Sequence, residues 1–99
     1  MKRMESLKLE VYSQASNAAV VRVPGRRFPG VVVQGDTLCS LQQRAEYVAE
    51  RLKSGHALEA AEVAGDLASS LDALLLHYEV VLGEHGIPLP YDATPRHLR

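Results

Sequence analysis

The segment Val23-Pro-Gly-Arg-Arg-Phe-Pro-Gly-Val-Val-Val-Gln-Gly-Asp-Thr-Leu38 contains two Pro-Gly pairs, a run of valines and a helix start. Pro24-Gly25 is typical of a type II turn, because proline fixes φ and glycine accepts a positive φ, and Pro29-Gly30 repeats the pair. The β-branched residues Val31–Val33 predict a strand that is central in its sheet and covered on at least one side. Asp36 predicts a helix N-cap, since its carboxylate can accept hydrogen bonds from first-turn amides.

Two further strands are predicted before this segment. Leu7, Leu9 and Val11 alternate with polar residues, which indicates a half-buried strand with these three side chains facing inward. Residues 18–23 form a second apolar run, and the intervening residues 14–17, Gln-Ala-Ser-Asn, are typical of a turn. Two strands joined by a short turn predict an antiparallel hairpin.

Two helices are predicted after the segment. Between residues 38 and 52, apolar residues recur at spacings of three and four, and Gly55 suits a left-handed C-terminal cap. A second, longer helix is predicted from about Ala57 to Leu82. Its Leu-Ala stripe is wider than one short sheet covers, which leaves intramolecular packing and a dimer contact open as alternatives.

The order β-β-β-α-α predicts an α+β fold, in which a three-stranded antiparallel sheet packs against two helices, the second of them long. A chain of 99 residues corresponds to one domain. We expect that domain over residues 1–91, with residues 92–99 as a flexible C-terminal tail.

The amino-acid composition excludes several classes of protein. The single cysteine, Cys39, excludes an internal disulfide and any zinc site built on cysteine pairs. The first ten residues contain no apolar run of a signal peptide, and no stretch of about 18 apolar residues follows. We therefore expect a cytoplasmic protein that does not cross a membrane.

Charge is spread unevenly along the chain. Residues 1–53 carry nine basic and five acidic residues, a balance of +4, and residues 54–99 carry two and seven, a balance of −5. The halves either neutralise each other within the fold or form opposite faces that steer a protein partner or head-to-tail self-association. The net charge of −1 argues against general nucleic-acid binding.

Arg26, Arg27 and Phe28 are the first candidates for a binding site. Two guanidiniums can hold carboxylates or phosphates in a bidentate way, and arginine with an aromatic residue is typical of interface hot spots. The alternative is that Phe28 folds into the core and the arginines are solvated turn residues. Gln34 and Tyr91 complete the predicted protein-binding set.

No complete catalytic motif is present, and we predict no catalytic residue, no cofactor and no metal. Cys39 has no base at a diagnostic spacing, and the glycines fit no phosphate-binding loop. The histidines lack the converging spacing of a metal site; they are His56, His77, His85 and His97.

The alternative function is a small ligand-binding protein or enzyme, with a pocket between the loop 24–30 and the segment 77–91. The groups of that pocket would be Arg26, Arg27, His77, His85 and Tyr91.

Several of these stretches together resemble a family of short, uncharacterised bacterial proteins, a domain of unknown function. They include Pro-Gly-Arg-Arg-Phe-Pro-Gly-Val, Gln-Gly-Asp, and a closing His-Tyr-Glu followed by His-Gly-Ile-x-Leu-Pro-Tyr. In this sequence the stretches are Val11–Ser13, Asn17–Arg22, Pro24–Val31, Gln34–Asp36 and His77–Tyr91. The resemblance spans most of residues 7–91, and it implies a bacterial source and no known activity.

A shorter part of the chain is similar to the antitoxins of the HicB type, which bind and block a small RNA-cleaving toxin with a degenerate ribonuclease-H-like sheet. The similar residues are Pro29-Gly30, Gly35–Leu38, Ala45-Glu46 and Gly83–Pro90. The chain departs from that family in its long second helix and in the lack of an evident appended DNA-binding domain.

We therefore expect a non-enzymatic bacterial interaction module, which neutralises or regulates a partner protein as an antitoxin or an immunity protein does. Arg26, Arg27 and Phe28 are its expected anchors. A homodimer that scaffolds a larger complex is a third hypothesis, and the identity of the partner protein stays open.

Overall fold

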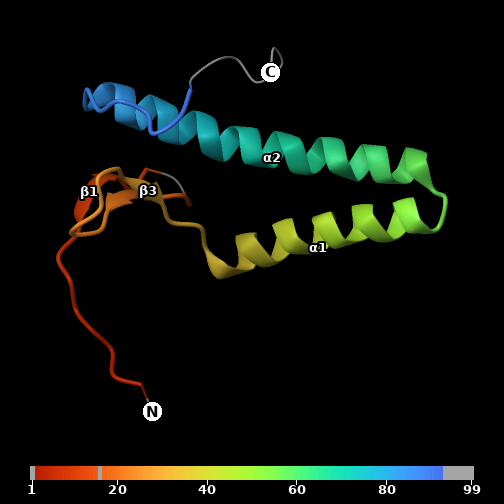
Figure 1. Ribbon diagram of the computed structural model, residues 1–99, viewed down its shortest axis with the longest axis horizontal. Helices are drawn as coiled ribbons and strands as arrows, with labels where there is room; N and C mark the ends of the chain where they lie inside the picture. The colour runs from red at the N-terminus through yellow and green to blue at the C-terminus, as the bar shows by residue number, and fades with distance from the viewer. Residues whose placement is uncertain (1, 16, 93–99) are drawn as a thin grey trace. The chain divides into compact units, whose positions relative to one another are not determined.

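The computed structural model describes residues 2–15 and 17–92, in the order β-β-β-α-α (Figure 1). The strands and helices are β1 (Glu10–Ser13), β2 (Val20–Arg22), β3 (Gly30–Val31), α1 (Gly35–Lys53) and α2 (Ala57–Glu84). The sheet is antiparallel with the strand order β1-β2-β3. The predicted α+β class, the three-stranded sheet and the longer second helix are confirmed. The expected tail beyond Asp92 lies outside the described residues.

The chain divides into two compact units. The first consists of Met1–Val32 together with the segment that begins at Tyr78, and it contains the sheet and the last turns of α2. The second is Val33–His77, which contains α1 and the rest of α2. In the second unit the two helices run side by side in opposite directions (Figure 1).

The core of the first unit joins β2 to the end of α2. Val20 is buried against three residues of α2 that lie on one helical face, Tyr78, Val81 and Leu82. Half-buried apolar residues on the segment after α2 close this cluster. The short sheet is thus held by a helix that lies more than fifty residues further along the chain.

β1 departs from the predicted strand in both its start and its orientation. Leu7, Leu9 and Val11 are exposed, and Tyr12 instead packs against the core. The pairing register with β2 shifts between Val11 and Ser13, so Tyr12 is the extra residue of a β-bulge. A bulge interrupts the alternation of side chains between the two faces of a strand, so a prediction that assumes strict alternation assigns these residues to the wrong face. The prediction that Leu7, Leu9 and Val11 face inward is wrong.

β3 is an edge strand, and the prediction of a central strand over Val31–Val33 is wrong. β2 occupies the central position, and both of its valines are buried. Val31 and Val32 are exposed, because β3 is only two residues long and pairs on one side alone. Gly30 pairs with Val21 within the sheet, so Pro29-Gly30 does not form a second turn.

α1 begins without the predicted cap. Gln34 is the N-cap residue, and its side chain makes no capping hydrogen bond. Asp36 is the second helical residue, and its Oδ1 accepts a hydrogen bond from the amide of Thr37 at 2.8 Å. The position predicted for Asp36 is wrong, although its negative charge still lies in the first turn, where it favours the helix dipole.

Both helices end at a glycine with left-handed backbone. Gly55, with φ of 81°, follows α1 and confirms the predicted cap. Gly86, with φ of 67°, follows α2, and the amide of Ile87 donates to the carbonyl of Leu82 at 2.9 Å. This is the backward bond of a Schellman motif. It turns the chain so that Ile87 packs against the core.

We predict that Leu82→Ala lowers the free energy of unfolding by about 2–5 kcal/mol, because Leu82 is 0% exposed and its loss leaves a cavity. The matched control is Leu76→Ala, the same change on α2 at a residue that is 56% exposed. Denaturant unfolding of both variants measures the difference. Equal effects of the two substitutions would contradict the described core.

Candidate functional site

The site predicted from the sequence centres on residues 23–29, which connect β2 to β3 and which we call the arginine loop. Gly25 has φ of 85°, and the amide of Arg26 donates to the carbonyl of Val23 at 3.1 Å. This hydrogen bond and the positive φ are those of a type II turn. The predicted turn at Pro24-Gly25 is confirmed, and it places the two arginines directly after the turn.

A buried hydrogen bond fixes the other end of the arginine loop. The hydroxyl of Tyr78, on α2, donates to the carbonyl of Pro29 at 2.6 Å. Pro29 is buried and Tyr78 is only 6% exposed, so water cannot replace either partner. Burial also raises the pKa of the Tyr78 phenol above its ordinary value of 10.0, because an ionised oxygen would lose its solvation.

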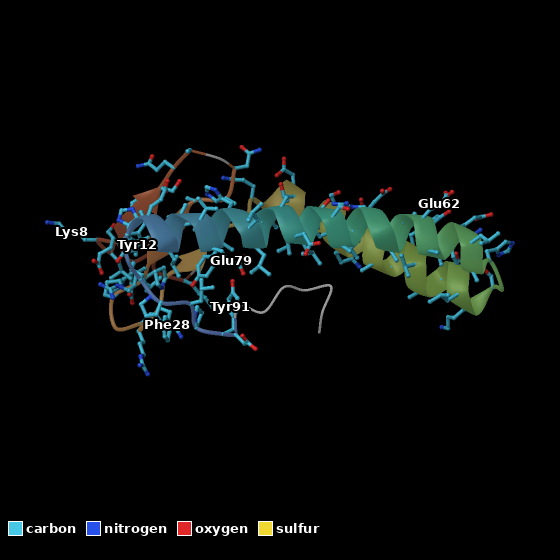
Figure 2. All side chains as sticks on the ribbon, turned by 90° about the horizontal axis from the view of Figure 1, so that it is seen from above. Lys8, Tyr12, Phe28, Glu62, Glu79 and Tyr91 are labelled. Atoms are coloured by element: carbon cyan, nitrogen blue, oxygen red, sulfur yellow. The ribbon has the colours of Figure 1, made fainter. Side chains whose placement is uncertain are left out.

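Tyr91 is connected to the loop through the same tyrosine. Its ring stacks on that of Tyr78, with the ring centroids 6.5 Å apart and the planes inclined by 25°. Its hydroxyl reaches back to α2 and donates to Oε2 of Glu79 at 3.0 Å (Figure 2). Tyr91 is thus connected to Pro29, the last residue of the arginine loop, through Tyr78.

Arg26 and Arg27 are exposed. The guanidinium carbon of Arg27 lies 5.2 Å from the centroid of the Phe28 ring, which is cation–π range. Phe28 itself is half-buried. Among the described residues, neither arginine has an ion pair with a carboxylate. Both guanidiniums therefore keep their bidentate hydrogen-bonding capacity for another molecule.

The remaining predicted residues have other surroundings. His85 lies edge-on to Tyr12 of β1, with ring centroids 5.0 Å apart, and its Nε2 donates to the Tyr12 carbonyl at 3.3 Å. His77 belongs to the second unit, and its Nε2 is buried without a hydrogen-bond partner among the described residues. Gln34 is also in the second unit, where it is exposed. His77 and His85, two residues of the alternative pocket, thus have different surroundings.

Sequence reasoning missed the residue that organises this site. The helical spacing of apolar residues places Tyr78 in the apolar stripe of the second helix and does not distinguish it from the other members of that stripe. A tyrosine that is buried usually finds a partner for its hydroxyl. The signal was therefore present in the sequence, but the partner, a carbonyl 49 residues away, follows only from the fold.

The second unit has a polar side along the seam between its two helices. A shallow groove there is lined by Ser40, Gln43, Arg44, Tyr47 and Val63. Arg44 donates from Nη1 to Oγ of Ser70 at 2.8 Å, and Arg51 donates to Oε2 of Glu59 at 3.3 Å. These arginines already have partners within the unit, unlike those of the arginine loop.

In the part of the chain that the structure describes, no three side chains of His, Cys, Asp or Glu gather as a metal ion would require. His97 lies outside that part. Cys39 is exposed on α1. No helix within the described ranges has the length and apolar character needed to span a bilayer.

The fold and the loop define a small α+β protein, in which a three-stranded sheet and the end of a long helix hold a basic turn. The model of a family of unknown function, DUF6959, matches residues 4–91, and the chain belongs to this family. No curated protein and no solved structure matches the chain. The similarity to HicB-type antitoxins is not confirmed by these comparisons.

We predict that Tyr78→Phe lowers the free energy of unfolding by about 1–3 kcal/mol near neutral pH, because the Pro29 carbonyl loses its buried donor. The variant also loses part of the alkaline pH dependence. The raised folded-state pKa of Tyr78 contributes stability that is complete below pH 10.0 and falls as the pH rises towards the folded-state value. Unfolding curves at neutral and alkaline pH measure both effects.

The control for this prediction is Tyr47→Phe, which removes the hydroxyl of an exposed tyrosine in the second unit. This variant should lower the free energy of unfolding by less than Tyr78→Phe does, because the Tyr47 hydroxyl, which donates to Glu59 at 3.5 Å, is exposed to water. A Tyr78→Phe chain with unchanged stability and unchanged slope would show that the loop does not depend on this hydrogen bond.

Proposed function

We propose that this chain is a non-enzymatic, cytoplasmic bacterial interaction module that binds a partner protein and neutralises or regulates it, as an antitoxin or an immunity protein does. The observation that carries the proposal is the arginine loop. Arg26 and Arg27 are exposed and have no ion-pair partner among the described residues. The turn before them and the Tyr78 bond after them hold the loop in place.

A preorganised loop favours binding. Ordering a flexible segment on association opposes affinity, and a loop that is fixed beforehand has less entropy to lose. The hydrogen bond at Pro29 and the turn hydrogen bond at Arg26 fix this loop at both ends. The guanidiniums then meet a partner from a defined position, which supports bidentate recognition of carboxylates.

Aromatic surface next to the arginines adds to the proposed anchor. Phe28 is half-buried under the guanidinium of Arg27, and Tyr91 is 36% exposed beside Tyr78. Arginine and tyrosine are enriched among the residues that dominate binding energy at protein interfaces. We propose Arg26, Arg27, Phe28 and Tyr91 as the binding surface for an acidic patch of the partner.

The alternative of a ligand-binding protein or enzyme remains a prediction, and no contact in the structure favours it. His85, one of its proposed groups, is held by Tyr12. Gln34 stays a predicted contact without further support.

We predict that the double substitution Arg26→Glu/Arg27→Glu weakens partner binding by at least about 30-fold, since hot-spot residues each contribute about 2 kcal/mol or more. The tagged full chain is used to capture proteins from its native bacterium, and mass spectrometry identifies a stoichiometric partner. Titration calorimetry with that partner then compares the natural chain with the variant.

The matched control is Lys2→Glu/Arg3→Glu, which makes the same change in net charge at two exposed residues in the N-terminal segment. It should leave the affinity unchanged at moderate ionic strength. A partner that binds the Arg26→Glu/Arg27→Glu chain as tightly as the natural chain would contradict the loop as the binding surface.

A further inference from the structure

The helical hairpin of the second unit has almost no interior of its own. Of Val33–His77, all of which the structure describes, only Ala60 is buried among the apolar residues, and no residue of α1 is buried. Five leucines of the hairpin are about half exposed or more: Leu38 at 59%, Leu52 at 58%, Leu58 at 86%, Leu71 at 47% and Leu76 at 56%. An unburied leucine loses the hydrophobic stabilisation that it would gain in a core.

The hydrogen bonds described above between α1 and α2 lie on one side of the seam between the helices, and the Gln42–Glu46 hydrogen bond within α1 lies on the other side, beside the apolar stripe that contains Leu38 and Leu52. Arg44 and Ser70, and Arg51 and Glu59, are cross-helix pairs. The groove described above opens on the side of these pairs, with Tyr47 at its edge. The two arginines on this side thus already have hydrogen-bond partners within the unit.

Helix geometry places three of the exposed leucines, Leu38, Leu52 and Leu71, on the opposite side, whereas Leu58 and Leu76 lie on the outer face of α2. An α-helix rotates by about 100° per residue. On α1, Leu38, Ala45 and Leu52 follow one another at intervals of seven residues. Viewed along the helix axis, they lie on one side of the half-buried Leu41 and Val48, and Arg44 lies on the other side. Their stripe therefore lies across the seam from the hydrogen bonds between the two helices.

The same rotation on α2 gives a matching stripe. Ala61, Ala68 and Leu71 are exposed and lie beyond the half-buried Leu67, on the side away from Ser70 and Glu59. Because the two helices are antiparallel and share the polar side, their apolar stripes share the other side. Together the stripes form one surface, the apolar hairpin face, which consists of Leu38, Ala45, Leu52, Ala61, Ala68 and Leu71.

We propose that the apolar hairpin face binds the same face of a second copy of this chain, so that two hairpins form a four-helix bundle. No member of the face is charged or polar. A partner that relies on hydrogen bonds or ion pairs finds nothing to bond there, whereas an identical apolar face brings no like-charge repulsion and no unsatisfied polar group. The arginine loop lies in the other unit, and this inference does not rest on its function.

The side of the hairpin that carries the face is large enough for a dimer interface. α1 has 19 residues and is about 28 Å long, and packed helices lie about 8–10 Å apart, which gives the pair a width of roughly 20 Å. Each copy then contributes roughly 550 Å², and two copies contribute about 1,100 Å², above the roughly 1,000 Å² expected of a specific interface.

The distribution of side-chain size on the face is compatible with two-fold symmetry. Leu38 and Leu71 lie towards one end of the hairpin and Leu52 towards the other, and Ala45 and Ala68 occupy the centre. A two-fold axis in the plane of the face and parallel to the helices brings Ala45 against Ala68 at the centre and Leu38 against Leu71 at one end, and it sets Leu52 against the smaller Ala61 at the other end. The small central residues allow close approach of the helices, and symmetric dimers require such self-complementary surfaces.

Sedimentation equilibrium of the full natural chain tests the proposal, under reducing conditions because Cys39 is exposed. We expect a mass of twice the 10.8 kDa of one chain. Ala45→Glu and Ala68→Glu each place a carboxylate at the centre of the face, and each should give the mass of one chain. Ala73→Glu, the same change at an exposed alanine on the polar side of α2, should remain a dimer.

A natural chain with monomer mass at high concentration would overturn the proposal, as would an Ala45→Glu chain that stays dimeric. Far-ultraviolet circular dichroism checks that each variant keeps its helix content. Leu38→Gln/Leu52→Gln, which adds no charge, is a second test of the same face and should also be monomeric. Partner capture by the monomeric Ala45→Glu chain distinguishes the two proposals, since its arginine loop is unchanged.

Discussion

The hydrogen bond from the Tyr78 hydroxyl to the Pro29 carbonyl connects the two parts of the first unit that the sequence separates most widely. Around it, Tyr78 fills the core beside Val20, and Tyr91 stacks on its ring. Tyr78, at the end of α2, therefore contacts both the sheet and the arginine loop. A neutral, buried phenol serves both purposes, because its ring supplies apolar area and its hydroxyl satisfies a carbonyl that would otherwise be buried without a donor.

Much of this fold could be predicted from local sequence. The antiparallel hairpin, the turn at Gly25, the cap at Gly55 and the two helices all depend on residues that are close in the chain, and all are present. The predictions fail where distant residues decide. Tyr12 takes the covered face of β1 through a bulge, and the valines of the third strand lie at an edge because β2 takes the centre.

The candidate site was predicted in part for the same reason. Arg26, Arg27 and Phe28 are adjacent in the chain, and a turn before them could be recognised from Pro24-Gly25 alone. The connection of Tyr91 to the loop depends on Tyr78, and no local pattern contains it. His85 was grouped with the loop by its position near the chain's end, but its contacts are with β1.

The two units expose different kinds of side chain without a partner or cover. In the second unit the arginines are paired with serine or glutamate, and it is the leucines that lack cover. In the first unit the apolar core is closed around Leu82, and it is Arg26 and Arg27 that lack ion-pair partners among the described residues. Each unit thus leaves one kind of surface unsatisfied, which is why we assign a polar partner to one and a second copy to the other.

The central claim is that a partner protein binds the arginine loop. Hydrogen exchange of the chain with and without its captured partner tests this most directly, because the amides of residues 23–29 that lack partners within the protein exchange fast unless a bound molecule covers them. The account predicts that binding slows exchange in residues 23–29 and around Tyr91. Protection confined to α1 and the first turns of α2, with no change in the loop, would contradict it.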